Sequence, residues 1–554
     1  MGKRRTRLAA LALTIMLLAG LAAGCGQQSA GTELSVCVGD SYSTLDPIYA
    51  EDISSQTVLV HLYENLMRVT ADSSGAATVV NGMAKSVETE ENTDGTVTYT
   101  FQLRSADWSD GQRVTAEDFV YAWRRLADPS SHSPYASLLS VVCGYQEARE
   151  AGDMSLLQVS AESDTVFQVT LTGKYDWFLR EVCTSPATMP LREDVVQRLK
   201  EAQSTGEDGT TASWWSDPLA LVTNGPYQAE EYAEGSYLQL VAGEDSDRNG
   251  PYRLTFHFAA STGEAQEMYN QGLVDAVWPL SEERLQELSQ DEDWSPIPEL
   301  ATYSVVYNCD SEGALADMAI RQALTLAVDR NALAEQAGVT AQAAGGFIPP
   351  GVPEDEETDF RTAGGDLLDN DPESYAERCA QARSILSDAG YSGAGLGELE
   401  YLYVEDGTTG AVAEALCEQW SQVLDVDVTP RAVTSQELWS ALRSGEYTLA
   451  GVNLEAPGND AECFLMDWIS DSYDNVANYE NSAYDTLMSI IARASDGTAR
   501  MGCLHDAEAL LLEDQVLNPL YTEGTAWELR EGLTGACRDA RGWFDFSNVT
   551  VQTA

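Results

Sequence analysis

Residues 108–129, with the sequence WSDGQRVTAEDFVYAWRRLADP, are the stretch from which the fold can be predicted. Just before it, apolar and polar residues alternate from Val97 to Leu103, which is the period-two pattern of a half-buried strand. Thr115 and Asp118 have the spacing of a capping box, in which two side chains satisfy free N–H groups at the start of a helix. Pro129 cannot continue a helix. The sequence therefore predicts a strand, a turn and a capped amphipathic helix, and these elements imply no catalytic group.

The particular residues in and around this stretch are more specific than their pattern. They resemble the signature of bacterial extracellular solute-binding protein family 5, the binding proteins of peptide and nickel ABC importers. The matching segments are Leu103-Arg104, Trp108-Ser109-Asp110-Gly111, Val114-Thr115-Ala116-Glu117-Asp118-Phe119 and Trp123-Arg124-Arg125. In that family the stretch is scaffold, so the resemblance indicates a class of protein and not its solute.

Further segments resemble the same family over roughly residues 33–550. They are Leu45-Asp46-Pro47, Tyr63-Glu64-Asn65-Leu66, Thr223-Asn224-Gly225-Pro226-Tyr227, Ile320 to Arg330 and Phe347 to Gly351. Asn65 stands where the family has a glycine, and asparagine also tolerates the left-handed backbone conformation. Alternating helix and strand patterns in the second half of the chain favour an α/β lobe.

The resemblance implies an α/β protein with the two-lobed periplasmic-binding-protein type II fold. An extra domain is inserted in the first lobe, as in the three-domain, peptide-binding class. The expected lobe I comprises residues 33–66, 188–304 and 519–554, the inserted domain II residues 67–187, and lobe II (domain III) residues 305–518. In the family, a strand near Tyr303–Asn308 leads from the first lobe to the second through a hinge.

The first 24 residues have the pattern of a lipoprotein-type signal peptide. A basic segment with Arg4 and Arg5 precedes a short apolar run from Leu8 to Leu21. Leu21-Ala22-Ala23-Gly24-Cys25 resembles a lipobox, which implies lipidation of Cys25 and a lipid-anchored linker over residues 25–32. A plain secretory signal or an uncleaved anchor is the alternative. We therefore expect a protein anchored to the extracytoplasmic face of the cell membrane, at the cell surface or in the periplasm.

Composition and charge weigh against several classes of function. The net charge of −58 disfavours nucleic-acid binding, which needs lysine and arginine to neutralise phosphates. It indicates a highly solvated acidic surface or, alternatively, a preference for cationic ligands. The four histidines lack metal-ligand spacing, and we find no G-x-S-x-G, P-loop or H-E-x-x-H motif, so no metal, cofactor or enzyme activity is expected. The cysteines after Cys25 are scattered, and free buried thiols are the expectation.

The segment from Gly445 to Leu465 is where we expect ligand binding. In peptide-binding members, the resemblance implies a cleft segment whose aspartate pairs with the α-ammonium group of the ligand. Glu455 is the nearest match to that aspartate, and Asp460 matches a second aspartate of the pattern. A fixed carboxylate suits this task, because only an opposite charge compensates a desolvated ammonium group. An exposed loop carboxylate is the plainer interpretation of Glu455.

Four further residues complete the candidate site. Val452 takes the place of a cleft tryptophan of the family, and Asn453 follows it. Tyr49 lies in an opening segment that skirts the cleft in the family, and Tyr135 belongs to a matching serine-proline-tyrosine-alanine element. Loop or packing roles are the alternatives for both tyrosines.

The expected function is that of a monomeric substrate-binding lipoprotein of an ABC importer. It would capture a small oligopeptide-like solute between two lobes and deliver it to the membrane permease subunits. Nickel, a nickel chelate or another small cationic solute is the alternative ligand, although the scarcity of histidine argues against direct metal ligation. Peptide sensing or chaperoning without transport is a further alternative, and a secreted hydrolase would need a nucleophile and a base that the sequence does not display.

Overall fold

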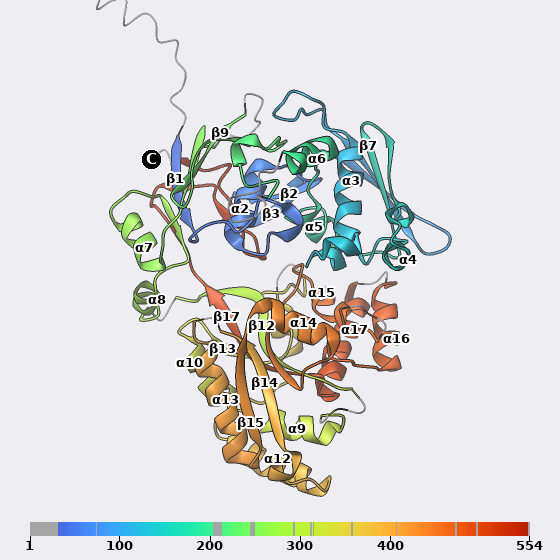
Figure 1. Ribbon diagram of the computed structural model, residues 1–554, viewed down its shortest axis with the longest axis vertical. Helices are drawn as coiled ribbons and strands as arrows, with labels where there is room; N and C mark the ends of the chain where they lie inside the picture. The colour runs from blue at the N-terminus through green and yellow to red at the C-terminus, as the bar shows by residue number, and fades with distance from the viewer. Residues whose placement is uncertain are drawn as a thin grey trace, which may run out of the picture.

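The computed structural model describes residues 32–73, 75–202, 213–243, 250–291, 294–310, 313, 315–355, 358–405, 407–470, 472, 474–494 and 497–551. The predicted signal peptide, the predicted lipidation site Cys25 and the linker up to residue 31 lie outside the described residues. Within the described part of the chain, no helix is both long and apolar enough to cross a membrane. Figure 1 shows two bodies stacked along the long axis of the molecule.

Lobe I is built on a six-stranded sheet in the order β18-β11-β1-β10-β9-β8 (Figure 1). Its strands are β1 (Glu33–Val38), β8 (Tyr227–Ala233), β9 (Tyr237–Ala242), β10 (Arg253–His257), β11 (Ala276–Trp278) and β18 (Glu528–Leu529), and its helices include α2 (Ile53–Leu62), α7 (Thr262–Asn270) and α8 (Glu282–Leu288). Buried side chains of β1 and α2 share one hydrophobic core. The edge strand β18 comes from near the C-terminus, so lobe I is assembled from segments far apart in the sequence.

Domain II contains a four-stranded antiparallel sheet in the order β4-β5-β7-β6. The elements of this region are β2 (Met67–Ala71), β3 (Ala77–Asn81), β4 (Ala84–Glu91), β5 (Val97–Leu103), β6 (Val159–Ser163), β7 (Val166–Leu171), α3 (Ala116–Ala127), α4 (Tyr145–Ala151), α5 (Phe178–Glu181) and α6 (Glu193–Glu201). The predicted strand is confirmed as β5, whose alternate residues from Val97 to Leu103 are buried. The predicted helix is confirmed as α3.

The predicted capping box at the start of α3 is present and has an additional member. The backbone N–H of Thr115 donates to the Asp118 carboxylate over 2.8 Å. The indole N–H of Trp108 donates to the same carboxylate over 3.2 Å, so the turn before the helix is tied to the cap. Burial raises the pKa of Asp118, and the hydrogen bonds from Thr115 and Trp108 oppose that rise. The spacing of Trp108, Thr115 and Asp118 thus has a local structural cause.

Lobe II is built on a second six-stranded sheet, in the order β13-β17-β12-β16-β14-β15. Its strands are β12 (Ile297–Tyr307), β13 (Gln342–Ala343), β14 (Glu398–Val404), β15 (Asp427–Val433), β16 (Leu449–Glu455) and β17 (Leu517–Thr525). Its helices are α9 (Met318–Leu326), α10 (Arg330–Ala337), α11 (Phe360–Gly364), α12 (Tyr375–Asp388), α13 (Thr409–Leu424), α14 (Ser435–Ser444), α15 (Ala461–Leu465), α16 (Ser482–Ile491) and α17 (Gly497–Glu513). Helix α13 and strands β14 and β15 share a core that includes the fully buried Trp420.

Two antiparallel strands, β12 and β17, carry the chain between the lobes (Figure 1). They pair with each other from Ile297 opposite Thr525 to Val306 opposite Leu517, and Tyr303 stacks on Tyr521 with ring centroids 5.0 Å apart. The expected lobe boundaries at 304/305 and 518/519 fall inside these strands. Because both strands belong to the lobe II sheet, we propose to place the change of lobe before β12 and after β17.

Gly451 in β16 offers a test of how tightly the lobe II sheet is packed. An added Cβ would lie 2.0 Å from the Tyr401 hydroxyl oxygen and 2.5 Å from that of Tyr303. Gly451→Ala is therefore expected to lower the free energy of unfolding by about 1–3 kcal/mol, the usual effect of overpacking a core. Gly502→Ala in α17 is the control, because nothing lies within 4 Å of its added Cβ. Urea unfolding that shows equal effects for both variants would contradict this prediction.

Candidate binding site

Strand β16 separates the predicted residues according to the face on which they lie. Side chains alternate along a strand, so residues two apart share a face. Asn453 and Glu455 are accessible on one face of β16, whereas Val452 is 3% exposed and belongs to the main hydrophobic core. The structure therefore places Val452 away from the face that carries Glu455.

A pocket that opens to solvent lies between the two lobes beside Glu455, with about 320 Å³ of space between protein atoms when the solvent at its mouth is included. Its lining residues come from lobe I, domain II and lobe II: Ala50, Gln56, Tyr135, Ser185, Pro186, Ala187, Glu455, Ala456, Pro457, Arg541 and Trp543. Because no single lobe supplies the whole wall, the pocket exists only when the lobes are brought together. We call it the interlobe pocket.

Glu455 is the charged residue with the most unusual environment in the interlobe pocket. Its side chain is accessible to water, but this surface faces a crevice in which protein displaces much of the bulk solvent. Burial, together with repulsion from Glu299 and Glu51, raises the pKa of Glu455 to about 7, and Arg538 opposes the rise. No described residue forms an ion pair or side-chain hydrogen bond with its carboxylate. Such a carboxylate gains free energy when a cation arrives.

Tyr135 lies in the same pocket as Glu455. Its hydroxyl donates to the backbone oxygen of Ala50 over 2.9 Å and accepts a hydrogen bond from Gln56 over 3.1 Å. Burial and the nearby negative charge of Glu455 raise the pKa of Tyr135, so the phenol stays protonated. Tyr135 thus presents a fixed, neutral wall next to the carboxylate.

Tyr49 lies outside the interlobe pocket. It borders a separate open groove on domain II, where its hydroxyl donates to the backbone oxygen of Ser131 over 2.6 Å. The guanidinium carbon of Arg125 lies 6.0 Å from the centre of the Tyr49 ring. The structure therefore does not bring Tyr49 together with Glu455.

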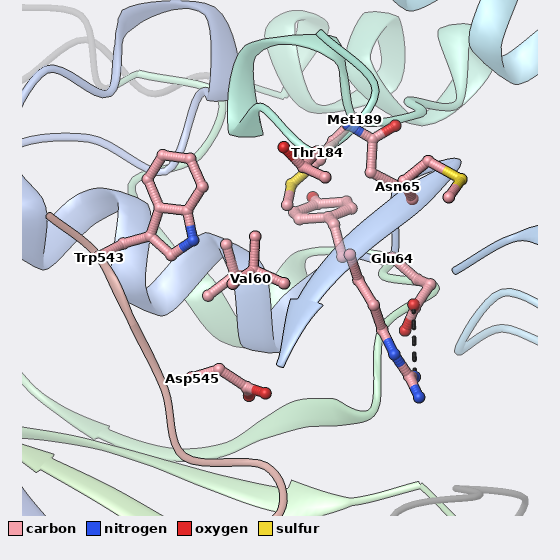
Figure 2. A pocket seen from close by; sticks show the side chains of 11 residues that line it. Val60, Glu64, Asn65, Thr184, Met189, Trp543 and Asp545 are labelled. Atoms are coloured by element: carbon pink, nitrogen blue, oxygen red, sulfur yellow. Dashed lines mark ion pairs between the residues drawn. The ribbon is translucent and has the colours of Figure 1, made fainter. Parts of the chain in front are cut away.

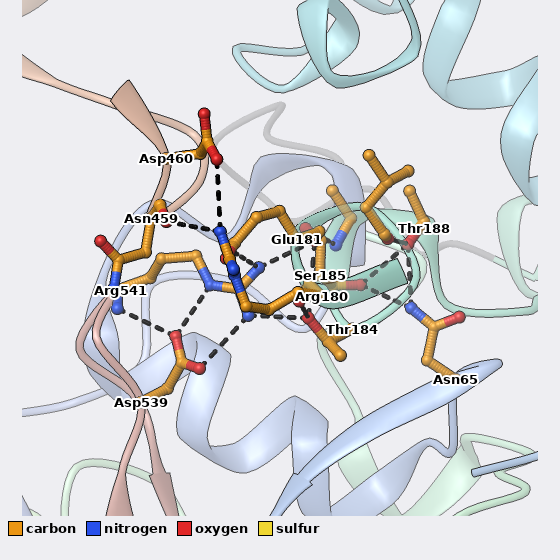
Figure 3. Close-up of polar contacts among 12 residues, drawn as sticks. Asn65, Arg180, Glu181, Thr184, Ser185, Thr188, Asn459, Asp460, Asp539 and Arg541 are labelled. Atoms are coloured by element: carbon orange, nitrogen blue, oxygen red, sulfur yellow. Dashed lines mark hydrogen bonds and ion pairs between the residues drawn. The ribbon is translucent and has the colours of Figure 1, made fainter. Parts of the chain in front are cut away.

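Asp460 is occupied by arginine side chains. It lies 2.6 Å from Arg500 in the same lobe and 3.5 Å from Arg180 of α5, and it also caps α15 (Figure 3). The Arg180 guanidinium also donates to the backbone oxygen of Asn459 over 2.9 Å. With both carboxylate oxygens engaged, Asp460 joins lobe II to domain II in this structure.

Sequence reasoning missed a second set of charges next to Asp460. Arg541 donates to the backbone oxygen of Glu181 over 2.8 Å and pairs with Asp539 at 2.8 Å (Figure 3). Glu181, Asp539 and Arg541 are all buried. Together with Arg180 and Asp460 they form what we call the interlobe ion cluster. No local motif marks these residues, because they come from three separate parts of the chain.

A further contact between the lobes involves Trp177 of domain II. Its indole N–H donates to the Glu462 carboxylate over 2.9 Å, and Arg500 pairs with the same carboxylate at 2.7 Å. Trp177 and Glu462 are both buried. Domain II and lobe II are therefore in direct contact away from the paired strands β12 and β17.

A second cavity, with about 370 Å³ of space that includes solvent at its opening, lies where lobe I meets domain II (Figure 2). Trp543 borders both this cavity and the interlobe pocket. Its polar wall is already engaged, because Glu64 pairs with Arg68 at 3.6 Å and Asp545 lies 3.8 Å from His61. The interlobe pocket, with its unpaired Glu455, is therefore the better candidate for a ligand.

Asn65, in the wall of this second cavity, does not have the left-handed backbone conformation that its match to a glycine of the family suggested. It is not among the described non-glycine residues with positive φ, so no left-handed backbone explains it. Its side-chain amide instead donates to the backbone oxygen of Ser185 over 2.8 Å and to the Thr188 hydroxyl over 2.9 Å (Figure 3). Asn65 thus satisfies buried polar groups.

Known proteins similar to this chain share most of its length. The probable deoxycholate-binding periplasmic protein YgiS of Escherichia coli is 28% identical over 492 residues, 86% of this chain and 85% of that protein. The periplasmic oligopeptide-binding protein OppA of Salmonella typhimurium is 27% identical over 513 residues, 87% of this chain and 86% of that protein. The crystal structure of Haemophilus influenzae OppA in complex with RPPGFSPFR superposes with a TM-score of 0.74 at 25% identity, over 95% of this chain and 100% of that one.

A family model covers the greater part of the chain. The model of bacterial extracellular solute-binding proteins, family 5 Middle, matches residues 78–486. This range includes most of domain II, strand β12 and the segment with Glu455. The chain therefore belongs to the bacterial extracellular solute-binding proteins of family 5.

Proposed function

We propose that this protein captures a small oligopeptide between its lobes, with Glu455 as the partner of the peptide α-ammonium group, and delivers it to an ABC importer. The observation that carries this proposal is the carboxylate of Glu455, which faces the interlobe pocket without a pairing cation among the described residues. A peptide α-ammonium group is protonated at neutral pH and would supply that cation. OppA proteins, which are similar in sequence and fold, are oligopeptide-binding proteins by name.

The charge of the cleft favours a cationic group over an anionic one. Burial raises the pKa of Glu51, of Glu299 and of Glu455, and the negative charges of Glu299 and Glu51 add to the rise at Glu455. An anionic solute such as deoxycholate, named for the relative YgiS, would add a further negative charge there. Nickel finds less support, because among the described residues no group of three or more His, Cys, Asp or Glu could hold a metal ion.

The remaining parts of the proposal concern the setting in which binding occurs. Lipidation of Cys25 would hold the protein at the extracytoplasmic face of the membrane, within reach of permease subunits. We expect the protein to be a monomer there. A peptide sensor on the same fold would use the same pocket without transport, and uptake of labelled peptide by cells with and without the gene separates the two roles. We expect no enzyme activity, because the members of this family are binding proteins.

Glu455→Gln tests the proposed ammonium contact. The change removes the charge while keeping the shape, so peptides with a free α-ammonium group should lose at least ~1 kcal/mol of binding free energy relative to N-acetylated peptides. Isothermal titration calorimetry with tri- to pentapeptide pools measures both. Glu418→Gln, an exposed change on α13, is the matched control and should leave both affinities unchanged. Equal losses for free and acetylated pools would remove Glu455 from this role.

The affinity for free-amine peptides should rise with pH between about pH 5.5 and 7.5. The pKa of Glu455 is about 7 without ligand, and its ionised form is the one that binds an ammonium group. Calorimetry of Glu455→Gln over the same pH range should show that the rise in affinity caused by ionisation of Glu455 is gone. A wild-type affinity that falls as pH rises through this window would contradict the prediction.

The raised pKa of Glu455 also predicts a difference in stability. An acid with a raised pKa in the folded chain holds its proton more tightly there, so the ligand-free protein loses stability as pH rises from the ordinary carboxyl pKa of 4.5 to about 7. Glu455→Gln should therefore raise the melting temperature more at pH 8 than at pH 5. An equal shift at both pH values would show that ionisation of Glu455 does not oppose folding.

Arg180→Gln tests whether the interlobe ion cluster supports closure. The change removes the contacts with Asp460 and Asn459 across the lobes, so the closed state loses about 0.5–1.5 kcal/mol and peptide affinity should fall by roughly 2- to 10-fold. Small-angle scattering should show a larger radius of gyration for the ligand-free variant. Arg431→Gln, which breaks a pair with Glu400 at 2.8 Å inside the lobe II sheet, should change neither quantity. Identical affinities for wild type and Arg180→Gln would contradict the role.

A further inference from the structure

Glu299 is a second acid on the face of the lobe II sheet that carries Glu455. The backbone oxygen of Leu300 accepts a hydrogen bond from the N–H of Ala456 over 3.2 Å, which extends the pairing of β12 with β16 by one step beyond Glu455. The same register brings Glu299 opposite Pro457, which lines the interlobe pocket and lies two residues after Glu455. Residues two apart in a strand share a face, so Glu299 and Glu455 are diagonal neighbours, roughly 7–8 Å apart.

The carboxylate of Glu299 is only partly compensated in this structure. Its side chain is 30% exposed, and its one ion pair among the described residues is with Arg538, with 3.7 Å between Oε1 and Nη2. Charge-assisted contacts are strongest at about 2.7–2.9 Å, so this pair is a long one. Burial raises the pKa of Glu299, and the positive charge of Arg538 opposes that rise. Glu299 can therefore gain from a further cation on its accessible side.

Acids outnumber bases around the interlobe pocket. Glu51 and Asp52 follow Ala50, which lines the pocket, and the carboxylate of Asp52 accepts hydrogen bonds from the neutral N–H and hydroxyl groups of Ser55 over 2.7 and 2.6 Å. When ionised, the groups around Glu455 have a formal sum of −2. They are the four acids Glu51, Asp52, Glu299 and Glu455 and the two bases Arg443 and Arg538. One α-ammonium group leaves this sum at −1.

The other polar residues of the pocket wall do not supply the missing positive charge. Arg541 lines the pocket, but two acids pair with it, Asp539 at 2.8 Å and Glu181 at 3.2 Å. Gln56 also lines the pocket and is 6% exposed, and its amide oxygen has no hydrogen-bond partner among the described residues. An acceptor without a donor keeps its partial negative charge uncompensated. The pocket therefore attracts more positive charge than one ammonium group carries.

We propose that the interlobe pocket selects oligopeptides whose first residue has a cationic side chain, with the α-ammonium group at Glu455 and the side-chain cation at Glu299. The first side chain is attached to the carbon that carries the α-ammonium group, and the four-carbon stem of lysine spans the distance between diagonal neighbours on a sheet. Such a ligand brings the formal sum of charges to zero. This inference rests on the proposed function, because it takes Glu455 as the partner of the α-ammonium group.

Three tripeptides test the preference in the wild-type protein. Lys-Ala-Ala carries the second cation on the first residue, norleucine-Ala-Ala has an uncharged first side chain of similar length, and Ala-Ala-Lys carries the same cation two residues further along. Calorimetry at pH 7.5 should show that Lys-Ala-Ala binds at least ~5-fold more tightly than each of the other two, because a contact with a charged partner contributes more than one with a neutral group. Equal affinities for Lys-Ala-Ala and norleucine-Ala-Ala would overturn the proposal.

Glu299→Gln tests whether Glu299 is the residue responsible. The variant should bind norleucine-Ala-Ala like wild type and lose most of the preference for Lys-Ala-Ala, whereas Glu299→Asp, which keeps the charge, should retain a preference. Glu418→Gln, an exposed change on α13, is the matched control and should leave both affinities unchanged. A full preference in Glu299→Gln would overturn the assignment to Glu299.

The outcomes for this inference and for the proposed function are separate. If wild type binds norleucine-Ala-Ala and N-acetylation of that peptide weakens binding, the proposed function stands whatever the effect of the lysine side chain. If wild type binds none of the three peptides, the proposed function fails and this inference fails with it. Urea midpoints show which variants fold, and the comparison of peptides in wild type decides the preference even if Glu299→Gln does not fold.

Discussion

Strand β12 is the element on which the arrangement of the binding site depends. It pairs with β17, the other strand between the lobes, on one side and with β16 on the other, so it also positions the segment with Glu455. Backbone hydrogen bonds between strands fix the register, and a slip of one residue would turn every side chain to the opposite face. The pairing of Ala301 with Glu455 therefore decides that the carboxylate faces the cleft and that Val452 faces the core.

The electrostatics of the cleft follow from this placement. In a chain of net charge −58, one more glutamate on the surface would be ordinary. Glu455 differs because protein surrounds it and two other acids lie near it, so its charged form is disfavoured until a cation arrives. A binding site gains selectivity in this way, since the ligand relieves an unfavourable state of the protein.

The contacts between domain II and lobe II contribute to the geometry of the closed molecule more than to its stability. Buried ion pairs lose most of their attraction to desolvation, and their net effect on folding is often small. Arg180, Asp460 and the buried Trp177–Glu462 hydrogen bond nevertheless have one arrangement in which all partners are satisfied. They therefore define how the lobes meet, and a ligand that favours closure shifts the population toward that arrangement.

The sequence by itself determined the local elements and the family. The strand at Val97–Leu103 and the capping box of Thr115 and Asp118 were predictable because period-two alternation and helix capping involve neighbouring residues. Glu455 was also found from its place in a matching segment. Only the tertiary structure decided that Asp460 pairs with arginines and that Tyr49 lies apart from the pocket. These outcomes depend on distances between residues that are far apart in the chain. Such distances decide how strongly a charge is desolvated and which other charges act on it, and the local sequence contains no information about them.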